Sequence, residues 1–197
     1  MQSQTFVFFG IVGSGKGTQV KLLMDFLKNK NTKECVYIGT GDIFREIVGS
    51  SKDDSETQTV KEIINSGRLM PDEITNKLVF EAVKLKSSPD KHLIFDGYPR
   101  TTPQSKYFAN LVKERTDIKI IFIELNKEEA MKRNLLRGRH DDTREGLTKR
   151  FNEYVNNVIP AMNYFKGKAG YQIYTINGEQ TVENVHKDII KALGFNL

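Results

Sequence analysis

Gly10-Ile-Val-Gly-Ser-Gly-Lys-Gly-Thr18 is a glycine-rich loop that follows the apolar run Thr5-Phe-Val-Phe-Phe9 and precedes a helical pattern of apolar residues beginning at Val20. A strand, a glycine-rich turn and a helix in this order indicate a phosphate-binding loop, because glycines let backbone N–H groups turn inward around phosphates. The helix N-terminus adds partial positive charge. Lys16 would reach the outer phosphates of a triphosphate, and the Thr18 hydroxyl would lie near a metal ion. The residues predicted to bind the nucleotide here are Gly13, Ser14, Gly15, Lys16, Gly17 and Thr18.

Further apolar runs have the length of strands, and helical patterns separate them. Together with the first run they cover 5–9, 34–38, 92–95, 118–124 and 171–176. Strands that alternate with helices predict parallel βαβ units, and runs that are apolar almost throughout predict a sheet covered on both faces. We therefore expect an α/β fold with a doubly wound, five-stranded parallel sheet in three αβα layers, within one domain at 1–197.

The connection between the second and third runs is longer than a simple crossover. A polar stretch at 49–57 leads into a helical pattern near 57–65, and Pro71 opens another helix with acidic residues in its first turn. Residues from about 41 to 86 are therefore expected to be helical. We predict a small helical insertion at 40–71 that is able to move relative to the sheet.

Asp96 comes directly after the third apolar run, at the carboxyl end of a predicted strand beside the phosphate loop. This is the usual place of a carboxylate that holds Mg²⁺, directly or through water. A lone Asp after a strand is often a loop cap, but here it opens the sequence Asp96-Gly-Tyr-Pro-Arg100. We predict that Asp96 and Thr18 hold Mg²⁺ near the phosphates, Asp96 through a bridging water.

The net charge of +5 and the pI near 9.1 invite a nucleic-acid interpretation, but the distribution of charge argues against it. Lysines are scattered and stand mostly near Asp or Glu, as on a solvated surface. Arginines instead cluster, since five of nine lie between Arg133 and Arg150. Planar guanidinium groups that are always charged suit phosphate groups. This cluster favours a phosphorylated small molecule, and no nucleic-acid partner is expected.

Several other classes of protein are disfavoured by what the chain lacks. The single cysteine, Cys35, forms neither an internal disulfide nor a four-cysteine zinc site. No stretch is long and apolar enough to span a membrane, and no signal peptide is visible at the N-terminus. We expect a cytoplasmic protein that uses Mg²⁺, with no zinc and no membrane partner.

These motifs together resemble the adenylate kinase branch of the nucleoside monophosphate kinases, over the whole length of the chain. The loop matches the family's G-x-x-G-x-G-K-G-T, with Val12 where a proline is frequent. Thr40-Gly-Asp-Ile-Phe-Arg45 matches T-G-D-x-x-R, and Asp96-Gly-Tyr-Pro-Arg100 matches D-G-F/Y-P-R. Gly67-Arg-Leu-Met-Pro-Asp72 resembles G-x-L-V-P-D, a segment whose backbone lines the base pocket in that family.

The resemblance implies a role for each matching residue. ATP would lie on the phosphate loop, with Arg133 stacked on its adenine and Arg137 at its phosphates. A minimal lid at 137–145 would close over the site, because only Gly138 separates Arg137 from Arg139, where even short-lidded relatives have several more residues. The implied AMP-binding residues are Thr40, Arg45, Met70, Gly97, Arg100, Gln104, Arg139 and Arg150, and the implied catalytic residues are Lys16, Arg100, Arg137, Arg139 and Arg150.

The implied reaction is reversible phosphoryl transfer from MgATP to AMP by a monomeric enzyme. Such transfer depends on positioning and charge stabilisation and needs no protein nucleophile. Thr40 and Gln104 favour AMP, since pyrimidine-specific relatives often have Ala and Asn there, but a UMP/CMP kinase or another monophosphate kinase stays an alternative. A non-kinase ATP-binding regulator is a further alternative, disfavoured because Arg45 and Arg100 are both present.

Overall fold

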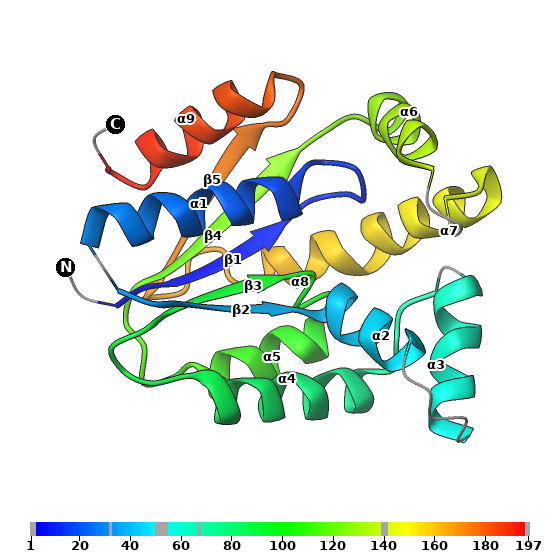
Figure 1. Ribbon diagram of the computed structural model, residues 1–197, viewed down its shortest axis with the longest axis horizontal. Helices are drawn as coiled ribbons and strands as arrows, with labels where there is room; N and C mark the ends of the chain where they lie inside the picture. Colours follow the sequence, from blue (N-terminus) through cyan, green and yellow to red (C-terminus); the bar gives the residue numbers. More distant parts are fainter. Residues whose placement is uncertain (1–2, 32, 50–54, 67, 139–141, 196–197) are drawn as a thin grey trace.

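Parallel strands form one sheet at the centre of the molecule (Figure 1). The computed structural model describes residues 3–31, 33–49, 55–66, 68–138 and 142–195. The strands are β1 Thr5–Phe9, β2 Cys35–Gly39, β3 His92–Asp96, β4 Ile118–Glu124 and β5 Tyr171–Asn177. Their order is β2-β3-β1-β4-β5, and every neighbouring pair is parallel. The predicted five-stranded parallel sheet is confirmed, and β2 lies one residue later than its apolar run.

Helices cover both faces of this sheet. Their bounds are α1 Lys16–Asn31, α2 Thr40–Gly49, α3 Ser55–Ser66, α4 Asp72–Lys86, α5 Thr102–Leu111, α6 Lys127–Arg137, α7 Arg144–Glu153, the π-helical turn η1 Tyr154–Val158, α8 Ile159–Asn163 and α9 Val182–Ala192. α1 and α9 lie side by side on one face, and α4, α5 and α8 pack on the other (Figure 1). This arrangement confirms the three predicted layers.

The two faces of β1 belong to two different apolar cores. Phe6 and Phe8 pack with residues of α1 and α9, whereas Val7 and Phe9 pack with residues of α4, α5 and α8. Every residue of β1 is buried. Because side chains alternate between the faces of a strand, a strand that is apolar at each position has to be covered on both sides.

The sheet brings three of the sequence motifs to one edge. β3 and β4 flank β1 on opposite sides, and ligands of such sheets bind at the carboxyl ends of the strands where the order reverses. Asp96, the last residue of β3, is aligned with Phe8 of β1 and with Gly39 of β2. The phosphate loop, the T-G-D motif and the D-G-Y-P-R motif therefore start close together.

α2 and α3 account for the helical segment that was expected between the second and third strands. They contact each other beyond the end of the sheet (Figure 1). α4 begins at Asp72, one residue later than predicted, because Pro71 is its N-cap and has an extended ψ of 140°. Movement of 40–71 relative to the sheet stays a prediction. Among the helices that the structure describes, none has the length and apolar character to cross a membrane.

Candidate active site

The phosphate loop has a backbone shape that only glycine accommodates at one of its turns. Gly13 has a φ of +87°, a left-handed conformation that side chains rarely adopt. A Cβ on Gly13 would also lie 2.3 Å from Asn134 Nδ2, so the position has no room for a side chain. The Lys16 ammonium donates to the carbonyls of Gly10 and Ile11, at 2.8 and 2.9 Å. The loop thus holds its lysine at the start of α1, where phosphates are expected to bind.

Charged groups from separate segments act on Lys16. Burial lowers the pKa of Lys16 to about 8; the Asp96 carboxylate opposes this shift, while Arg100 and Arg137 lower the pKa further. Burial likewise raises the pKa of Asp96 above its ordinary value, against the effects of Lys16 and Arg100. Perturbed values of this kind are typical of sites where charge is concentrated in partly desolvated space. The structure therefore brings together a residue predicted for ATP, one for the metal, one for AMP and one for the lid.

Asp96 lies beside the first turn of α1. A Cβ on Gly17 would lie 3.8 Å from Asp96 Oδ2, so this carboxylate faces the phosphate loop. Thr18, in the same turn, has an exposed side chain. Within the described residues, no group of three or more His, Cys, Asp or Glu side chains gathers around one point. One carboxylate that faces the phosphate loop fits Mg²⁺, which keeps several waters and binds through one or two carboxylates plus substrate phosphates.

Thr40, Gly97 and Arg100 form a connected group on the monophosphate side. The Gly97 carbonyl accepts hydrogen bonds from Thr40 Oγ1 and from Arg100 Nε, both at 2.7 Å. Gly97 has a φ of +74°, and a Cβ there would lie 2.6 Å from Arg100 Nη2. A side chain at position 97 would therefore displace the guanidinium. The structure brings these three predicted site residues into direct contact.

Gln104 is buried with 2 % of its surface exposed, and half of its amide is engaged. Its Oε1 accepts from the Arg100 N–H at 2.7 Å, and its Nε2 donates to Asp72 Oδ1 at 2.8 Å. A primary amide offers two donors and two acceptor positions, so these two bonds use one donor and one acceptor position. Met70, also buried, stands directly before the proline that caps α4.

Arg45 lies on α2 and is more exposed than this group. Its Nη2 is 2.5 Å from Asp42 Oδ1, and its side chain is 51 % exposed. Asp42 Oδ2 in turn accepts from the Tyr37 hydroxyl of β2 at 2.6 Å. Burial is the main influence on the pKa values of Asp96 and Arg100, and the charge of Arg45 adds a smaller effect that lowers both. Sequence reasoning found Arg45 but missed the role of Tyr37, whose only signal is its position on the strand that leads into the T-G-D motif.

Asp142 anchors two of the predicted lid arginines. Arg137 binds it in a bidentate manner, with Nε and Nη2 at 2.9 and 2.8 Å from the two carboxylate oxygens, and Arg150 Nη1 is 3.3 Å from Oδ1. The Asp142 side chain is only 1 % exposed. Sequence reasoning did not select Asp142, because spacing across a helix boundary does not define which charges meet. Arg139 lies outside the described residues.

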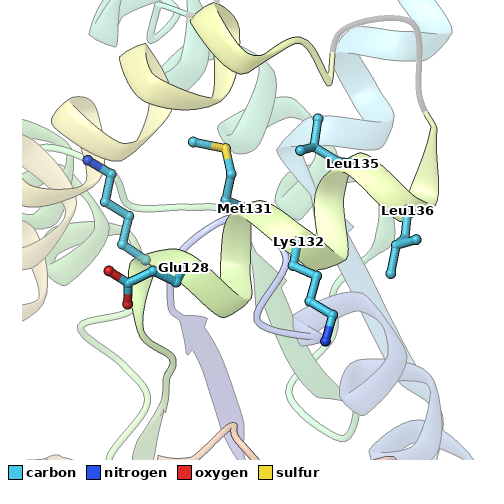
Figure 2. Close-up of a pocket in the computed structure, with 6 residues that line it drawn as sticks. Glu128, Met131, Lys132, Leu135 and Leu136 are labelled. Atoms are coloured by element: carbon cyan, nitrogen blue, oxygen red, sulfur yellow. The ribbon is translucent and has the colours of Figure 1, made fainter.

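α6 carries the remaining predicted site residue and a surface hollow. Arg133, expected to stack on the ATP adenine, pairs with Glu129 one turn earlier, at 2.8 Å. Figure 2 shows the hollow, a shallow depression of about 560 Å³ along the same helix. It is lined by Lys127, Glu128, Met131, Lys132, Leu135 and Leu136. Since no predicted site residue lines it, the hollow is separate from the candidate active site.

Comparison with known proteins gives a consistent result. A family model described as Adenylate kinase matches residues 8–170. An adenylate kinase of Bacteroides fragilis is 36 % identical over 197 residues, covering 95 % of this chain and 96 % of the relative. One of Parabacteroides distasonis is 34 % identical over 194 residues, with coverage of 95 % and 96 %. One of Rickettsia conorii is 29 % identical over 222 residues, with coverage of 96 % and 99 %.

Proposed function

The chain belongs to the adenylate kinase family, and we propose that it transfers the γ-phosphoryl group of ATP to AMP, reversibly, to give two ADP. The observation that carries the proposal is that Asp96 faces the phosphate loop while Arg100 bonds to Gly97, the residue directly after Asp96. An arginine of the monophosphate motif is thereby held next to the carboxylate that faces the phosphate loop. A protein that only bound ATP would need no monophosphate-side arginine beside its phosphate loop.

Transfer between two nucleotides depends on positioning and charge rather than on covalent catalysis. An oxygen of the AMP phosphate forms a bond to the γ-phosphorus, and the bond from that phosphorus to the β–γ bridging oxygen breaks as ADP leaves. Negative charge then spreads over the equatorial oxygens of the transferred group. We assign its stabilisation to Lys16, Arg100 and Arg137, each contributing about 3 kcal/mol. Arg139 and Arg150 complete the proposed catalytic set.

Mg²⁺ would enter with ATP, and Asp96 with Thr18 would hold it beside the phosphate loop. The ion supplies positive charge to the β- and γ-phosphate oxygens. The approach of Asp96 to Gly17 supports this assignment. The chain has one cysteine, which supports a lid without zinc.

Carboxylates hold several of the arginines that we assign to phosphates. Asp42 pairs with Arg45, and Asp142 pairs with Arg137 and Arg150. Guanidinium groups bind carboxylates and phosphates with the same forked geometry. Substrate phosphates would therefore take over donors that the carboxylates hold, and this exchange would accompany closure of the insertion and the lid.

The proposed acceptor is AMP, with ATP bound by the loop and by Arg133. Gln104 keeps one amide donor and one amide acceptor beyond its bonds to Arg100 and Asp72. Adenine presents a ring nitrogen that accepts and an N6 amino group that donates, which is the complementary pair. Thr40 and Met70 stand on the same side of the site in this assignment. A UMP/CMP kinase is the alternative that the amide does not favour.

A coupled assay with MgATP and a panel of monophosphates tests the proposal. We expect kcat/KM for AMP to exceed that for UMP, CMP and GMP. A preference for a pyrimidine monophosphate would show that AMP is not the acceptor. ATP consumption with no transfer to any monophosphate would reject the kinase assignment.

We also propose that the protein acts as a cytoplasmic monomer that binds neither nucleic acid nor membrane. Pairing of surface lysines with acidic residues supports the nucleic-acid part of this proposal, as in Lys91 with Glu34 and Lys149 with Glu145. Sedimentation equilibrium measures the mass in solution, and a dimer at assay concentration would contradict the monomer.

A further inference from the structure

Asn134 of α6 reaches into the phosphate loop although the two are far apart in the sequence. Its Nδ2 is 2.9 Å from the Val12 carbonyl oxygen and 2.6 Å from the Ala130 carbonyl oxygen. Only 1 % of the residue is exposed. Because carbonyl oxygens only accept hydrogen bonds, the amide nitrogen has to face both of them. The orientation of the Asn134 side chain is therefore determined by its surroundings.

The contact with Val12 fixes the direction of a backbone N–H in the loop. In a trans peptide the carbonyl of one residue and the N–H of the next point in opposite directions. Holding the Val12 carbonyl toward α6 therefore turns the Gly13 N–H away from α6. The missing side chain of Gly13 makes room for this, since a Cβ would lie 2.3 Å from Asn134 Nδ2.

Asn134 and Lys16 donate hydrogen bonds to different carbonyl groups of the phosphate loop. Lys16 donates to Gly10 and Ile11, and Asn134 donates to Val12. A lysine in such a loop binds the β- and γ-phosphates of a nucleotide, so its bonds to the carbonyls have to be given up when ATP binds. Asn134 takes no part in that exchange and keeps its carbonyl in place.

Stability alone does not explain an asparagine at this position. Among the residues that the structure describes, the Asn134 Oδ1 atom is buried and has no hydrogen-bond partner. A buried polar atom without a partner is unfavourable. Its surroundings are largely apolar, since Asn134 lines a small cavity together with Ile11, Leu147 and Phe151. A leucine would satisfy these apolar neighbours better than the amide does.

We propose that Asn134 is a positioning residue for ATP, which acts by orienting the Val12–Gly13 peptide so that the Gly13 N–H is ready for a phosphate oxygen. This inference rests on the proposed function of the loop as the ATP site. It adds a link between α6 and the phosphate loop that the sequence motifs do not contain.

Asn134→Leu tests the inference, because it removes the donor and the unpaired oxygen while it keeps a similar volume. We expect the Kd for MgATP, measured by calorimetry without AMP, to rise about tenfold, which corresponds to about 1.4 kcal/mol. The Kd for AMP should stay within about twofold of the wild-type value. The KM for ATP should likewise rise, and the KM for AMP should change little. Asn134→Ala is the second variant, in case leucine does not fit. Asn157→Ala is the matched control, since the Asn157 amide donates to Glu153 one turn earlier.

The outcomes separate the inference from the proposed function. Wild-type Kd for ATP in both folded Asn134 variants would overturn the inference, and so would equal losses for ATP and AMP, which indicate a general structural role. Failure of the wild-type protein to bind MgATP or to phosphorylate AMP would instead reject the function on which the inference rests.

Discussion

Lys16 holds its proton less firmly than an ordinary lysine. Its ammonium donates to loop carbonyls, and burial lowers its pKa to about 8. Phosphates would stabilise the protonated form and raise that pKa, so ATP binding near pH 8.5 should take up protons, and the Kd for ATP should increase as the pH rises through about 8. Calorimetry in two buffers of different ionisation enthalpy measures the uptake. Equal uptake in Lys16→Ala would contradict this role of Lys16.

Arg45 should contribute to binding of AMP, and Arg133 to binding of ATP. Arg45 belongs to the T-G-D motif at the start of α2, and Arg133 lies on α6. Arg45→Ala should raise the KM for AMP about tenfold or more and change the KM for ATP little, and Arg133→Ala should do the reverse. Initial rates with each substrate varied in turn check the prediction. Equal effects on both substrates would show that the assignment of the two half-sites is wrong.

The site residues that belong to sequence motifs could be predicted, whereas the residues that contact and orient those motifs could not. Lys16, Asp96 and Arg100 stand at fixed spacings that carry their own physical reason. Asn134 contacts Val12 across most of the chain, and Asp142 meets its arginines through the relative placement of two helices. Contacts of this kind depend on tertiary packing, which local pattern does not encode.

Asp142 joins the end of α6 to α7 through its two arginines. Asp142→Asn keeps the shape but leaves the positive charges of Arg137 and Arg150 without their shared carboxylate. Because both arginines are partly exposed, we expect a loss of about 1–3 kcal/mol in the free energy of unfolding, less than for a fully buried network. Urea denaturation measures it.

The matched control for Asp142 is Glu145→Gln on the same helix. Glu145 pairs with Lys149, and its side chain is 81 % exposed. Exposed pairs of this type contribute little to stability, because solvent screens the two charges. Equal effects of the two substitutions would show that burial of Asp142 does not strengthen its ion pairs.

The lid that we predict at 137–145 is short. Gly138 ends α6 in a left-handed conformation, with a φ of 64°, and Arg139 follows directly. A minimal lid should exclude water less completely than a long one. We expect slow ATP hydrolysis without AMP, well below the rate of transfer but above that of a long-lid relative. Inserting about four or five Gly/Ser residues after Gly138 should reduce this hydrolysis and retain transfer. Hydrolysis no faster than in the long-lid relative would contradict the prediction.

Secondary structure followed the sequence pattern closely, with differences at element ends. The apolar run at 34–38 predicted β2, which the structure assigns to Cys35–Gly39. Pro71 was expected inside α4 and is its N-cap. Ends depend on caps and on the direction of the following chain, so they carry weaker signals than a repeated apolar pattern.

At the scale of the whole molecule, the fold class was predictable and the strand order was not. Alternating runs and helices indicated a parallel sheet with two covered faces, and β1 has that burial. The order β2-β3-β1-β4-β5 arises from packing between segments far apart in the chain. That order brings Asp96 next to the phosphate loop and thereby unites the motifs into one site.

Incubation of the protein with MgADP alone tests the central claim most directly, with products followed by ³¹P NMR. An adenylate kinase uses ADP as both donor and acceptor, so ATP and AMP should at first appear in equal amounts, with free phosphate formed only at the much lower rate of the predicted ATP hydrolysis. Lys16→Ala should fold normally and lower this rate by about 10³-fold, whereas Lys21→Ala, an exposed lysine of the same helix, should leave it unchanged. Release of inorganic phosphate without AMP and ATP in equal amounts, or wild-type turnover in Lys16→Ala, would contradict the account.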